Sequence, residues 1–422
     1  MAKVPRDVAD LSLASNGKKR ILWSDRDMPV LALIRQRFEK QKPLRGLRMG
    51  CCMHVTSETA NLMRTLRAGG AQVALCASNP LSTQDDVAAS LVKDFGVPVF
   101  ARRAESVAVF YQHLNQVIDT KPQVTMDDGA DLVNLLHTKR ARDAKNIIAS
   151  MEETTTGVIR LRAMDNSGTL EFPVIAVNDA DTKHLFDNRY GTGQSTMDGV
   201  VRATDTLLAG KHVVVAGYGW CGRGVSMRAR GAGAIVTVTE IDPLKALEAV
   251  MDGFDVRPMA EAAAFGELFI TVTGNKHVLR AEHFRKMRDG AMVCNSGHFD
   301  VEIDIPALRK MSKRVIKGVR LHVDEYQISK NKSIHLLAQG RLINLSAATG
   351  HPPSVMDMSF ATQALAAEWA KKLRKRLPVG VHDVPKKIED WVSKLKLQAM
   401  GVKIDRLTRA QVAYLASSGE GT

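Results

Sequence analysis

Residues 211–242 read KHVVVAGYGWCGRGVSMRARGAGAIVTVTEID, and this stretch decides the fold of the chain. Its β-branched run at 213–215 is long enough for a strand that is buried on both faces. The turn that follows has the spacing Gly217-x-Gly219-x-x-Gly222. In such a turn the first glycine allows the tight bend, the second lets a pyrophosphate approach the backbone, and the third lets the next helix pack closely on the strand. The spacing therefore predicts a dinucleotide-binding loop.

The residues around the glycines strengthen this prediction. A helix is expected at 222–230 and a second β-rich strand at 235–239, followed by Glu240. The N-terminus of the helix offers free N–H groups and a partial positive charge to a pyrophosphate. Glu240 stands about 20 residues after the turn, where a carboxylate accepts a hydrogen bond from a ribose 2′-hydroxyl and repels a 2′-phosphate. We therefore expect NAD rather than NADP as the cofactor.

The first half of the chain alternates between strands and helices. Residues 1–45 read as mostly helical, and βα units follow them. Strands are expected at 47–53, 71–77, 97–100, 123–126 and 147–151, with helices at 58–68, 85–95, 107–118 and 130–139. Alternation of this kind predicts a parallel, doubly wound sheet.

The alternation continues beyond Glu240. Together with the strands at 213–215 and 235–239, those expected at 269–273, 291–295, 315–323 and 341–345 make a second sheet of six strands. An amphipathic helix is expected at 354–373. The fold class is therefore α/β, with two doubly wound, Rossmann-like parallel-sheet domains and a cleft between them. We expect a substrate-binding domain at 1–190 completed by 351–389, an NAD-binding domain at 191–350, and a short helical C-terminal tail at 390–422.

Polar side chains follow the expected strands of the first sheet at the points where these strands end. They are His54, Ser78, Asn79, Asp127, Asp128, Glu152 and Glu153. In open parallel sheets, ligands bind beyond the carboxyl ends of the strands. Any one of these residues, taken singly, is more often a helix N-cap or a solvated loop residue. Because several strand ends deliver polar groups to the same edge, we expect a site there.

Two further segments carry polar groups. The three threonines at 154–156 are expected to form a loop that presents hydroxyl groups. Lys183 and Asp187 are four residues apart and would share one face of a helix. Beside a nucleotide, a lysine placed in this way can handle protons. The segment 191–193, Gly-Thr-Gly, is expected to be a flexible hinge that leads into a helix at 195–208.

Composition limits the class of protein. The 422 residues should form two or three domains, and 45% hydrophobic with 25% charged residues is typical of a soluble globular protein. No apolar run approaches the ~18 residues of a membrane span, and the N-terminus lacks a secretory signal. The five cysteines lack metal-ligand spacing, so we expect reduced thiols, no metal and a cytoplasmic location. Because the net charge of +14 comes from basic residues scattered among acids, densest at 371–376, we expect neither a nucleic-acid nor a membrane partner.

A series of motifs in order resembles the S-adenosyl-L-homocysteine hydrolase family from about residue 8 to the C-terminus. The motifs are HVTSETANLMRTL, NPLSTQDDVAASL, DDGADLVNLLHTK, EETTTGV, VNDADTKHLFDNRYG, GYGWCGRG, TEIDP, CNSGHFDVEID and GHPPSVM. The GYGWCGRG turn is similar to that of short-tailed archaeal and thermophilic-bacterial members. The resemblance implies reversible hydrolysis of S-adenosyl-L-homocysteine to adenosine and L-homocysteine, with a tightly held NAD. It also implies a homo-oligomer, commonly a tetramer.

The family's chemistry implies roles for individual residues. The 3′-hydroxyl of the adenosine ribose is oxidised, the C4′ proton is removed, homocysteine leaves by β-elimination, water adds at C5′, and the ketone is reduced again. By resemblance, Asp128 removes the C4′ proton, with His54 assisting leaving-group protonation and water activation. Lys183 resembles the group that deprotonates the 3′-hydroxyl, with a pKa lowered by its site.

The resemblance also implies three sets of site residues. The catalytic set is His54, Asp128, Glu153, Lys183, Asp187, Asn188 and His298. The substrate-binding set is Thr56, Glu58, Asp128, Glu153, Lys183, Asp187, Leu345, Met356 and Phe360. The cofactor-binding set is Thr154, Thr155, Thr156, Asn188, Gly217, Gly219, Trp220, Cys221, Gly222, Arg223, Gly224, Glu240, Lys245, Ser296, Gly297, His298, Asn344 and His351.

The chain departs from the family pattern at several positions. Many members end in a tail with Lys and Tyr that reaches a neighbour's cofactor, whereas this chain ends at Gly421-Thr422. Thr192 stands where many members carry a cysteine near the active site. Lys245 replaces an asparagine that contacts the cofactor ribose in many members. Ala176 also replaces an asparagine. These differences bear on the affinity and exchange of the cofactor.

Three alternative functions remain open from the sequence. Some archaeal relatives prefer S-inosyl-L-homocysteine, but Glu58 favours adenosine, because a carboxylate accepts from the 6-amino group and faces a 6-oxo group unfavourably. An ordinary NAD-dependent dehydrogenase would release NADH at each turnover, whereas the hydrolase would not. A non-catalytic nucleotide-sensing protein is disfavoured by the joint presence of five polar residues, His54, Asp128, Glu153, Lys183 and Asp187.

Overall fold

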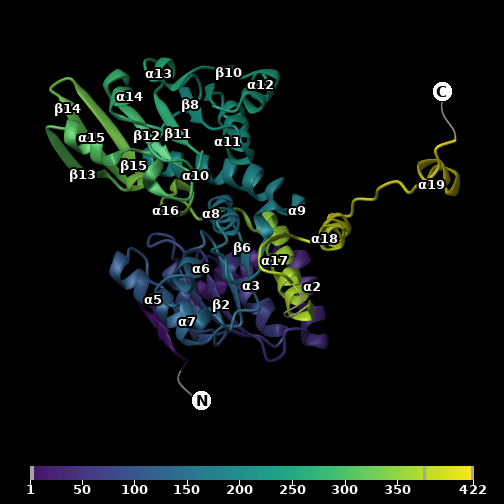
Figure 1. Ribbon diagram of the computed structural model, residues 1–422. Helices are drawn as coiled ribbons and strands as arrows, with labels where there is room; N and C mark the ends of the chain where they lie inside the picture. Colours follow the sequence, from purple (N-terminus) through teal and green to yellow (C-terminus); the bar gives the residue numbers. More distant parts are fainter. Residues whose placement is uncertain (1–3, 374–376, 420–422) are drawn as a thin grey trace.

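The computed structural model describes residues 4–373 and 377–419. Figure 1 shows two sheet-centred bodies that meet near helices α8 and α16. Within these ranges, no helix combines the length and the apolar character needed to cross a membrane. The last three residues of the basic run at 371–376, and residues 420–422 of the expected tail, lie outside the described residues.

The first sheet is parallel throughout, and the described residues give it eight strands in the order β1-β4-β3-β2-β5-β6-β7-β16. The strands are β1 (Arg6–Asp7), β2 (Arg48–Cys52), β3 (Gln72–Cys76), β4 (Val99–Phe100), β5 (Val124–Asp127), β6 (Ala149–Glu152), β7 (Val174–Ala176) and β16 (Val381–Asp383). The helical segments up to the crossover are η1 (Leu11–Leu13), α1 (Ala14–Arg26), α2 (Pro29–Gln41), α3 (Ser57–Ala68), α4 (Asp85–Lys93), α5 (Val107–Asp119), α6 (Asp131–Leu136), α7 (Ala141–Ala144), α8 (Thr155–Asn166), η2 (Val177–Asp179) and α9 (Asp181–His184).

The second sheet, counted over the same residues, also has eight strands, in the order β10-β9-β8-β11-β12-β15-β14-β13. The strands are β8 (His212–Ala216), β9 (Ile235–Thr239), β10 (Asp255–Val256), β11 (Leu268–Thr271), β12 (Ala291–Asn295), β13 (Arg314–Arg320), β14 (Val323–Ser329) and β15 (Lys332–Leu337). The helical segments around it are α10 (Thr192–Thr204), α11 (Trp220–Gly231), α12 (Pro243–Met251), α13 (Met259–Ala262), α14 (Ala281–Lys286), η4 (Asp300–Glu302), α15 (Ile305–Met311), η5 (Ala338–Gly340) and α16 (Ile343–Ser346).

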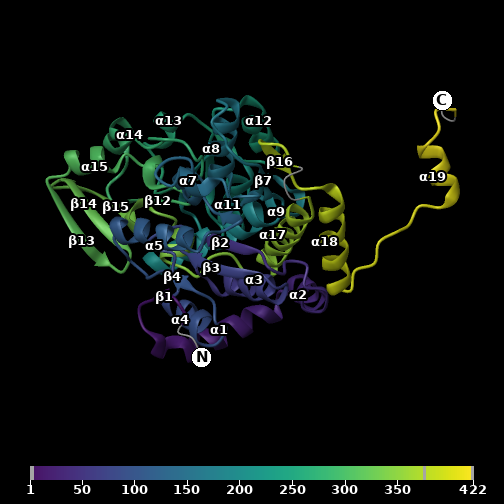
Figure 2. The same cartoon turned by 60° about the horizontal axis from the view of Figure 1, so that its bottom comes forward.

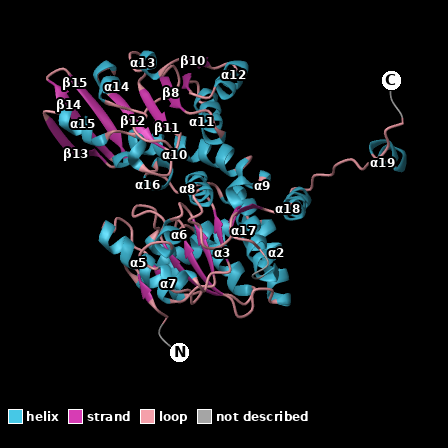
Figure 3. Ribbon diagram, in the orientation of Figure 1, coloured by secondary structure: helices cyan, strands magenta, loops and turns pink. Residues whose placement is uncertain are grey.

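Both sheets are covered by helices on their two faces, as Figure 3 shows. The β-branched strand β8 illustrates the reason: Val213 and Val215 belong to one apolar core and Val214 to another. In the first sheet, Cys51 and Cys52 divide in the same way between two cores. Successive side chains of a strand point to opposite faces, so a run that is apolar at every position needs a cover on both. The prediction of two doubly wound Rossmann-like sheets is confirmed.

One edge of the second sheet differs from the sequence prediction. β14 pairs antiparallel with both β13 and β15, so the expected strand at 315–323 is one arm of a hairpin. The expected strand at 341–345 is wrong, because this segment forms α16 and contributes only an isolated bridge from Leu342 to Asn295. A short apolar run does not distinguish a buried strand from a buried helical turn. The position beside β12 is occupied by β15 instead.

The segment expected to be a flexible hinge, 191–193, is helical, and the helix expected at 195–208 begins at Thr192. The chain runs from the π-helical turn η3 (Asp187–Gly191) directly into α10. A Cβ on Gly193 would lie 2.5 Å from the backbone oxygen of Gly224, and one on Gly191 would lie 2.9 Å from the His351 ring. These glycines therefore permit close packing between segments.

The chain returns to the first sheet after residue 350. Helix α17 (Pro353–Leu373) packs against α2, α3 and α18 (Lys386–Ala399). Asp357 on α17 is fully buried, accepts from the backbone N–H groups of Val30 and Leu31, and pairs with Lys396 on α18 at 2.9 Å. The hydrogen bonds from α2 tie the returning segment to the first body, and the ion pair joins α17 to α18. Figures 1 and 2 both place the last helix, α19 (Arg409–Leu415), away from the rest of the chain, and every residue from 401 to 419 is exposed.

Helix α11 offers a test of the close packing with a control on the same helix. A Cβ on Gly224 would lie 1.7 Å from the Arg189 backbone oxygen, whereas a Cβ on Gly231 would meet no described atom within 4 Å. We expect Gly224→Ala to lower the free energy of unfolding by about 1–3 kcal/mol through overpacking. Gly231→Ala should leave it unchanged or raise it by less than about 1 kcal/mol. Chemical denaturation of both variants measures the difference, and equal effects would contradict the packing argument.

Candidate active site

A cavity of about 1430 Å³ is lined by residues from both sheets. In the first sheet, the register brings the polar residues to one edge, because Cys52 pairs with Asp127 and Asp127 pairs with Glu152. The expected site residues that line the cavity are His54, Thr56, Glu58, Asp128, Glu153, Thr154, Thr155, Thr156, Lys183, Asp187, Asn188, Gly217, Gly219, Trp220, Cys221, Arg223, Glu240, Lys245, Ser296, Gly297, His298, Asn344, Leu345, His351, Met356 and Phe360. Two expected cofactor residues, Gly222 and Gly224, are described but are not among the lining residues.

The glycine loop has the shape that a dinucleotide requires. Gly217 has a φ of +106°, which favours glycine, and a Cβ on Gly222 would lie 1.9 Å from the Gly217 backbone oxygen. At Gly219, immediately before α11, an added Cβ would meet no described atom within 4 Å. The cavity therefore reaches the backbone at Gly219, where the free N–H groups of the helix N-terminus lie. This open approach fits the pyrophosphate of NAD.

Glu240 lies at the carboxyl end of β9 beside this loop. Its carboxylate accepts hydrogen bonds from the backbone N–H groups of Tyr218 at 2.7 Å, Ile241 at 2.7 Å and Asp242 at 3.1 Å. These donors hold the carboxylate in place. A fixed negative charge here suits a ribose 2′-hydroxyl and opposes a 2′-phosphate.

Lys183 is the centre of one cluster of buried polar groups. Its Nζ donates to Asn188 Oδ1 at 2.7 Å and Asn178 Oδ1 at 3.3 Å. It pairs with Asp187 Oδ1 at 3.2 Å and lies 3.9 Å from Glu153 Oε1. The helical turn that places Lys183 and Asp187 four residues apart therefore brings them into contact, as their spacing predicts.

The charge state of Lys183 differs from the sequence prediction. Burial lowers its pKa, but the carboxylates of Asp187, Glu153 and Asp128 outweigh burial, and the pKa is raised. The expectation of a lowered pKa, which the resemblance implied, is wrong, because three carboxylates surround this ammonium. Burial raises the pKa of Glu153 to about 8 against the opposing effect of Lys183. The pKa of Asp187 is lowered: burial raises it, but Lys183 and His351 outweigh that effect.

Three residues of this cluster were missed by sequence reasoning. Gln363 Nε2 donates to Glu153 Oε2 at 2.6 Å, and Ser359 Oγ donates to Asp187 Oδ2 at 2.8 Å. Both come from α17, which reaches the cluster only because the chain returns to the first sheet. The third is Asn178, whose Oδ1 also accepts from Asn188 Nδ2 at 3.0 Å. Asn178 lies in the VNDADTKHLFDNRYG motif, so that motif was the available signal.

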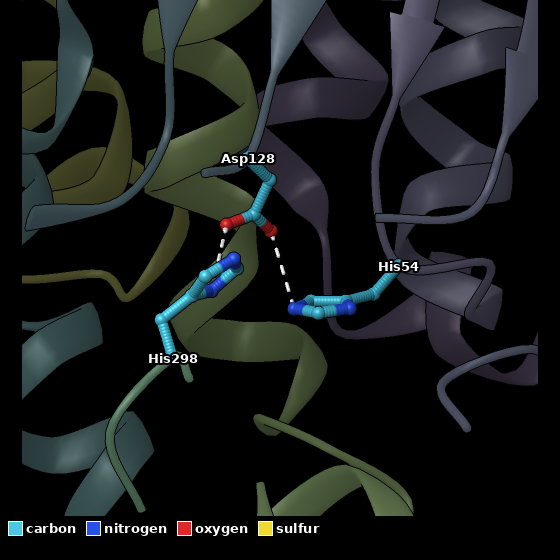
Figure 4. Close-up of side chains that lie close together, drawn as sticks. All are labelled: His54, Asp128 and His298. Carbon is cyan, nitrogen blue, oxygen red and sulfur yellow. Dashed lines mark ion pairs between the residues drawn. The ribbon is translucent and has the colours of Figure 1, made fainter. Parts of the chain in front are cut away.

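Asp128 is the centre of a second cluster, drawn in Figure 4. Its Oδ2 lies 3.3 Å from His54 Nε2, and its Oδ1 lies 3.8 Å from His298 Nδ1. Asp128 and His54 follow strands of the first sheet, whereas His298 follows β12 of the second. His298 approaches so closely that a Cβ on Gly129 would lie 2.3 Å from its Nε2. The cluster therefore joins the two sheets across the cavity.

Both histidines of the second cluster are neutral at physiological pH. Burial lowers the pKa of His54 to about 3, with His351 as a further cause, and burial lowers the pKa of His298 to about 4 against the effect of Asp128. Hydroxyls of Ser82 and Ser78 lie 2.7 and 3.0 Å from His54 Nδ1. A hydroxyl that donates to Nδ1 leaves Nε2–H directed at Asp128. Burial raises the pKa of Asp128 itself against the effects of His298 and Lys183.

The other acids at the strand ends hold the loops. Asp127 accepts from the N–H groups of Asp128 and Val133, each at 3.0 Å. Glu152 accepts from Gly129 at 2.8 Å and Ala130 at 3.0 Å. Both acids are fully buried and fix the turn that carries Asp128.

The cofactor side of the cavity has further lining residues that sequence reasoning missed. They are Thr273, Asn275, Lys276, His277 and Arg280 after β11, and Arg257 after β10. The buried Glu302 orders the first of these loops, since it accepts from the backbone N–H of Thr273 at 2.9 Å and of Gly274 at 2.8 Å. Asn344 and His351 are both expected to hold the cofactor, and Asn344 Nδ2 lies 3.4 Å from His351 Nε2. Asn344 Oδ1 is buried and has no hydrogen-bond partner among the described residues.

Comparisons with known proteins place this site in context. Residues 6–150 match the family profile described as S-adenosyl-L-homocysteine hydrolase, and residues 188–350 match its NAD binding domain. The chain is 61% identical over 416 residues to an adenosylhomocysteinase of Aquifex aeolicus, covering 99% of each chain. It is 59% identical over 421 residues to an adenosylhomocysteinase of Thermosynechococcus vestitus, covering 100% of this chain and 98% of the relative. It is 54% identical over 416 residues to an S-inosyl-L-homocysteine hydrolase of Methanocaldococcus jannaschii, covering 99% of this chain and 100% of the relative.

The neutral histidines make the stability of the protein depend on pH. In the unfolded chain a histidine takes up a proton near pH 6.5, whereas folded His54 and His298 resist until about pH 3 and 4. The unfolded state binds more protons in this window, so stability is lost as the pH falls below about 6.5. Between pH 7 and pH 5, the free energy of unfolding falls, and we expect His54→Asn and His298→Asn each to reduce this fall by about 2 kcal/mol. Denaturation at both pH values measures this, and a wild-type pH dependence in both variants would contradict it.

Proposed function

Because this chain belongs to the S-adenosyl-L-homocysteine hydrolase family, we propose that it hydrolyses S-adenosyl-L-homocysteine reversibly to adenosine and L-homocysteine. The observation that carries the proposal is that the Lys183 cluster, the Asp128 cluster and the open glycine loop share one cavity. NAD held at this loop would supply reversible hydride transfer, so that the ribose could be oxidised and later reduced without net redox change. The protein's own residues move the protons.

We assign deprotonation of the substrate 3′-hydroxyl to Lys183. A raised pKa makes the side chain an ammonium, so it must give up a proton before it accepts one. Glu153 lies 3.9 Å from Nζ, and in its ionised form this carboxylate is the neighbour that can take up the lysine proton. Asp187 and Asn188 hold Nζ in place at 3.2 and 2.7 Å. A base fixed in this way within hydrogen-bond reach of its proton is the arrangement that general-base catalysis needs.

We assign the next proton transfers to the Asp128 cluster. Oxidation at C3′ acidifies the adjacent C4′–H, and Asp128 removes that proton as the C4′ carbanion forms. The electron pair then breaks the C5′–S bond, and the homocysteine thiolate that leaves takes up a proton that passes from Asp128 through His54. After homocysteine has left, His54 activates the water that adds to C5′. His54 lies 3.3 Å from Asp128, so proton removal and leaving-group protonation are neighbouring events.

Burial of the two clusters supports this chemistry. Asp128, Glu153, Lys183, Asp187 and His298 are each less than 10% exposed. Exclusion of water strengthens the electrostatic contacts in the cavity and protects a ketone intermediate from side reactions. The closing wall comes from both sheets, because His298 belongs to one and Asp128 to the other.

The organisation beyond the site is also a proposal. We propose that residues 1–190 and 351–389 bind substrate, that 191–350 bind NAD, and that 390–422 form a tail, although α18 spans residue 390. The packing of α17 on α2 and α3 supports the return of the chain to the substrate side. We further propose a homotetramer in the cytoplasm, in keeping with the family resemblance.

Replacement of Lys183 by methionine tests the first assignment. Lys183→Met keeps the length of the side chain and removes its proton chemistry. We expect reduction of bound NAD by adenosine to slow by about 10²–10⁴-fold. Stopped-flow absorbance of the reduced cofactor measures the rate, with melting temperature and NAD content as controls for folding. An unchanged rate would remove Lys183 from the mechanism.

Replacement of Asp128 by asparagine separates the second step from the first. Asp128→Asn should still reduce bound NAD on addition of adenosine, because Lys183 serves that step. Exchange of the C4′ proton in heavy water should fall by about 10²–10⁴-fold. Proton NMR of adenosine incubated with the variant follows the exchange. Exchange at the wild-type rate would rule out Asp128 as the C4′ base.

A further inference from the structure

Glu58 lines the cavity from the first turn of α3, directly after the N-cap residue Thr56 and Ser57. It is only 5% exposed, and the N-terminus of a helix favours a negative charge at this position. One carboxylate oxygen, Oε2, accepts no hydrogen bond from the described residues. The other oxygen, Oε1, is held by two serine hydroxyls.

The two serines come from different helices. Ser57 Oγ, on α3, donates to Oε1 at 2.8 Å. Ser24 Oγ, in the last turn of α1, lies 2.9 Å from the same oxygen and 2.8 Å from Ser57 Oγ. Ser24 is 4% exposed and does not line the cavity among the described residues. Its hydroxyl therefore acts on the cavity only through Glu58 and Ser57.

This arrangement determines what Glu58 offers to a ligand. Each serine has a single O–H proton, and both protons are directed along a chain of hydroxyls that ends on Oε1. A carboxylate that receives such donors on one oxygen is held in one position, with its other oxygen left free to accept. Oε2 then presents a fixed acceptor to the cavity. An exocyclic amino group can donate to it, whereas an oxo group brings a second acceptor against a negative charge.

We propose that Ser24 is a specificity-determining positioning residue, which holds the Glu58 carboxylate as an acceptor directed at the cavity and thereby selects a 6-aminopurine nucleoside over its 6-oxo analogue. The inference rests on the proposed function and assigns the substrate's base to one end of the same cavity. Selection of this kind is strong, because a buried polar group without its partner costs far more than a lost apolar contact.

The test compares two substrates in three forms of the full-length enzyme with NAD bound. Release of homocysteine from S-adenosyl-L-homocysteine and from S-inosyl-L-homocysteine is followed with a thiol reagent, and kcat and KM are determined for each. For Ser24→Ala we expect KM for the adenosyl substrate to rise by about tenfold or more, with kcat within about twofold of the wild type. The ratio of kcat/KM, adenosyl to inosyl, should fall by at least about tenfold.

The control variant is Ser90→Ala. Ser90 is also buried and also donates to a carboxylate, Asp94 Oδ2, at 2.8 Å, but it lies outside the residues that line the cavity. This variant should keep the wild-type ratio. If Ser24→Ala does not fold, Ser57→Ala removes the other hydroxyl of the chain and should lower the ratio in the same direction.

The outcomes separate the inference from the function on which it rests. A wild-type enzyme that releases homocysteine from neither substrate would refute the proposed function. A wild-type enzyme that prefers the adenosyl substrate, with an unchanged ratio in Ser24→Ala or in Ser57→Ala, would overturn the role of the serine chain. Equal losses on both substrates would show that Ser24 supports only the fold, and would overturn it equally.

Discussion

A single buried ammonium, Lys183 Nζ, makes the arrangement of acids in the cavity possible. Asp187, Glu153 and Asp128 all lie in a region with little access to water, where isolated carboxylates would be unstable as anions. Lys183 contacts Asp187 at 3.2 Å and Glu153 at 3.9 Å. Its positive charge opposes the rise in pKa that burial causes in both carboxyl groups. Removal of this cation would leave several buried charges uncompensated, which is among the costliest defects in a protein. Helices α9 and α17 and the π-helical turn η3 all contribute side chains to this centre, so its charge balance and the local fold depend on each other.

The Asp128 cluster obeys the opposite electrostatic rule. Its histidines are buried without enough negative charge to keep a proton, so His54 and His298 are neutral. One cavity thus contains an ammonium among acids and an acid among neutral imidazoles. Pairs of titratable groups whose surroundings push their pKa values apart are how one site runs acid and base steps at one pH. The two centres are coupled, because Asp128 also contributes to the raised pKa of Lys183.

The sequence was sufficient to predict what depends on local pattern and on strand ends. His54, Asp128 and Glu153 were expected at one edge because parallel strands end together, and the described register brings these ends together. Ser359 and Gln363 were missed, because they meet Asp187 and Glu153 from 172 and 210 residues away along the chain. No local pattern reports such a contact. The prediction of a lowered pKa for Lys183 was also wrong, since the direction of the shift depends on how many carboxylates surround the side chain.

The glycines show how close the two sheets must come for the site to be complete. Sequence reasoning gave Gly191 and Gly193 a role in flexibility, and it read the glycines of residues 217–224 as contacts for a cofactor. In the structure, Gly193 packs against the Gly224 backbone and Gly191 against the His351 ring, while Gly129 admits His298 beside Asp128. At Gly129, an added methyl group would fill the space through which the two sides meet. A reaction that must keep water from its intermediate needs walls from both sheets, and the missing side chains let those walls approach. The glycines of the junction are therefore part of the catalytic architecture, although they carry no chemical group.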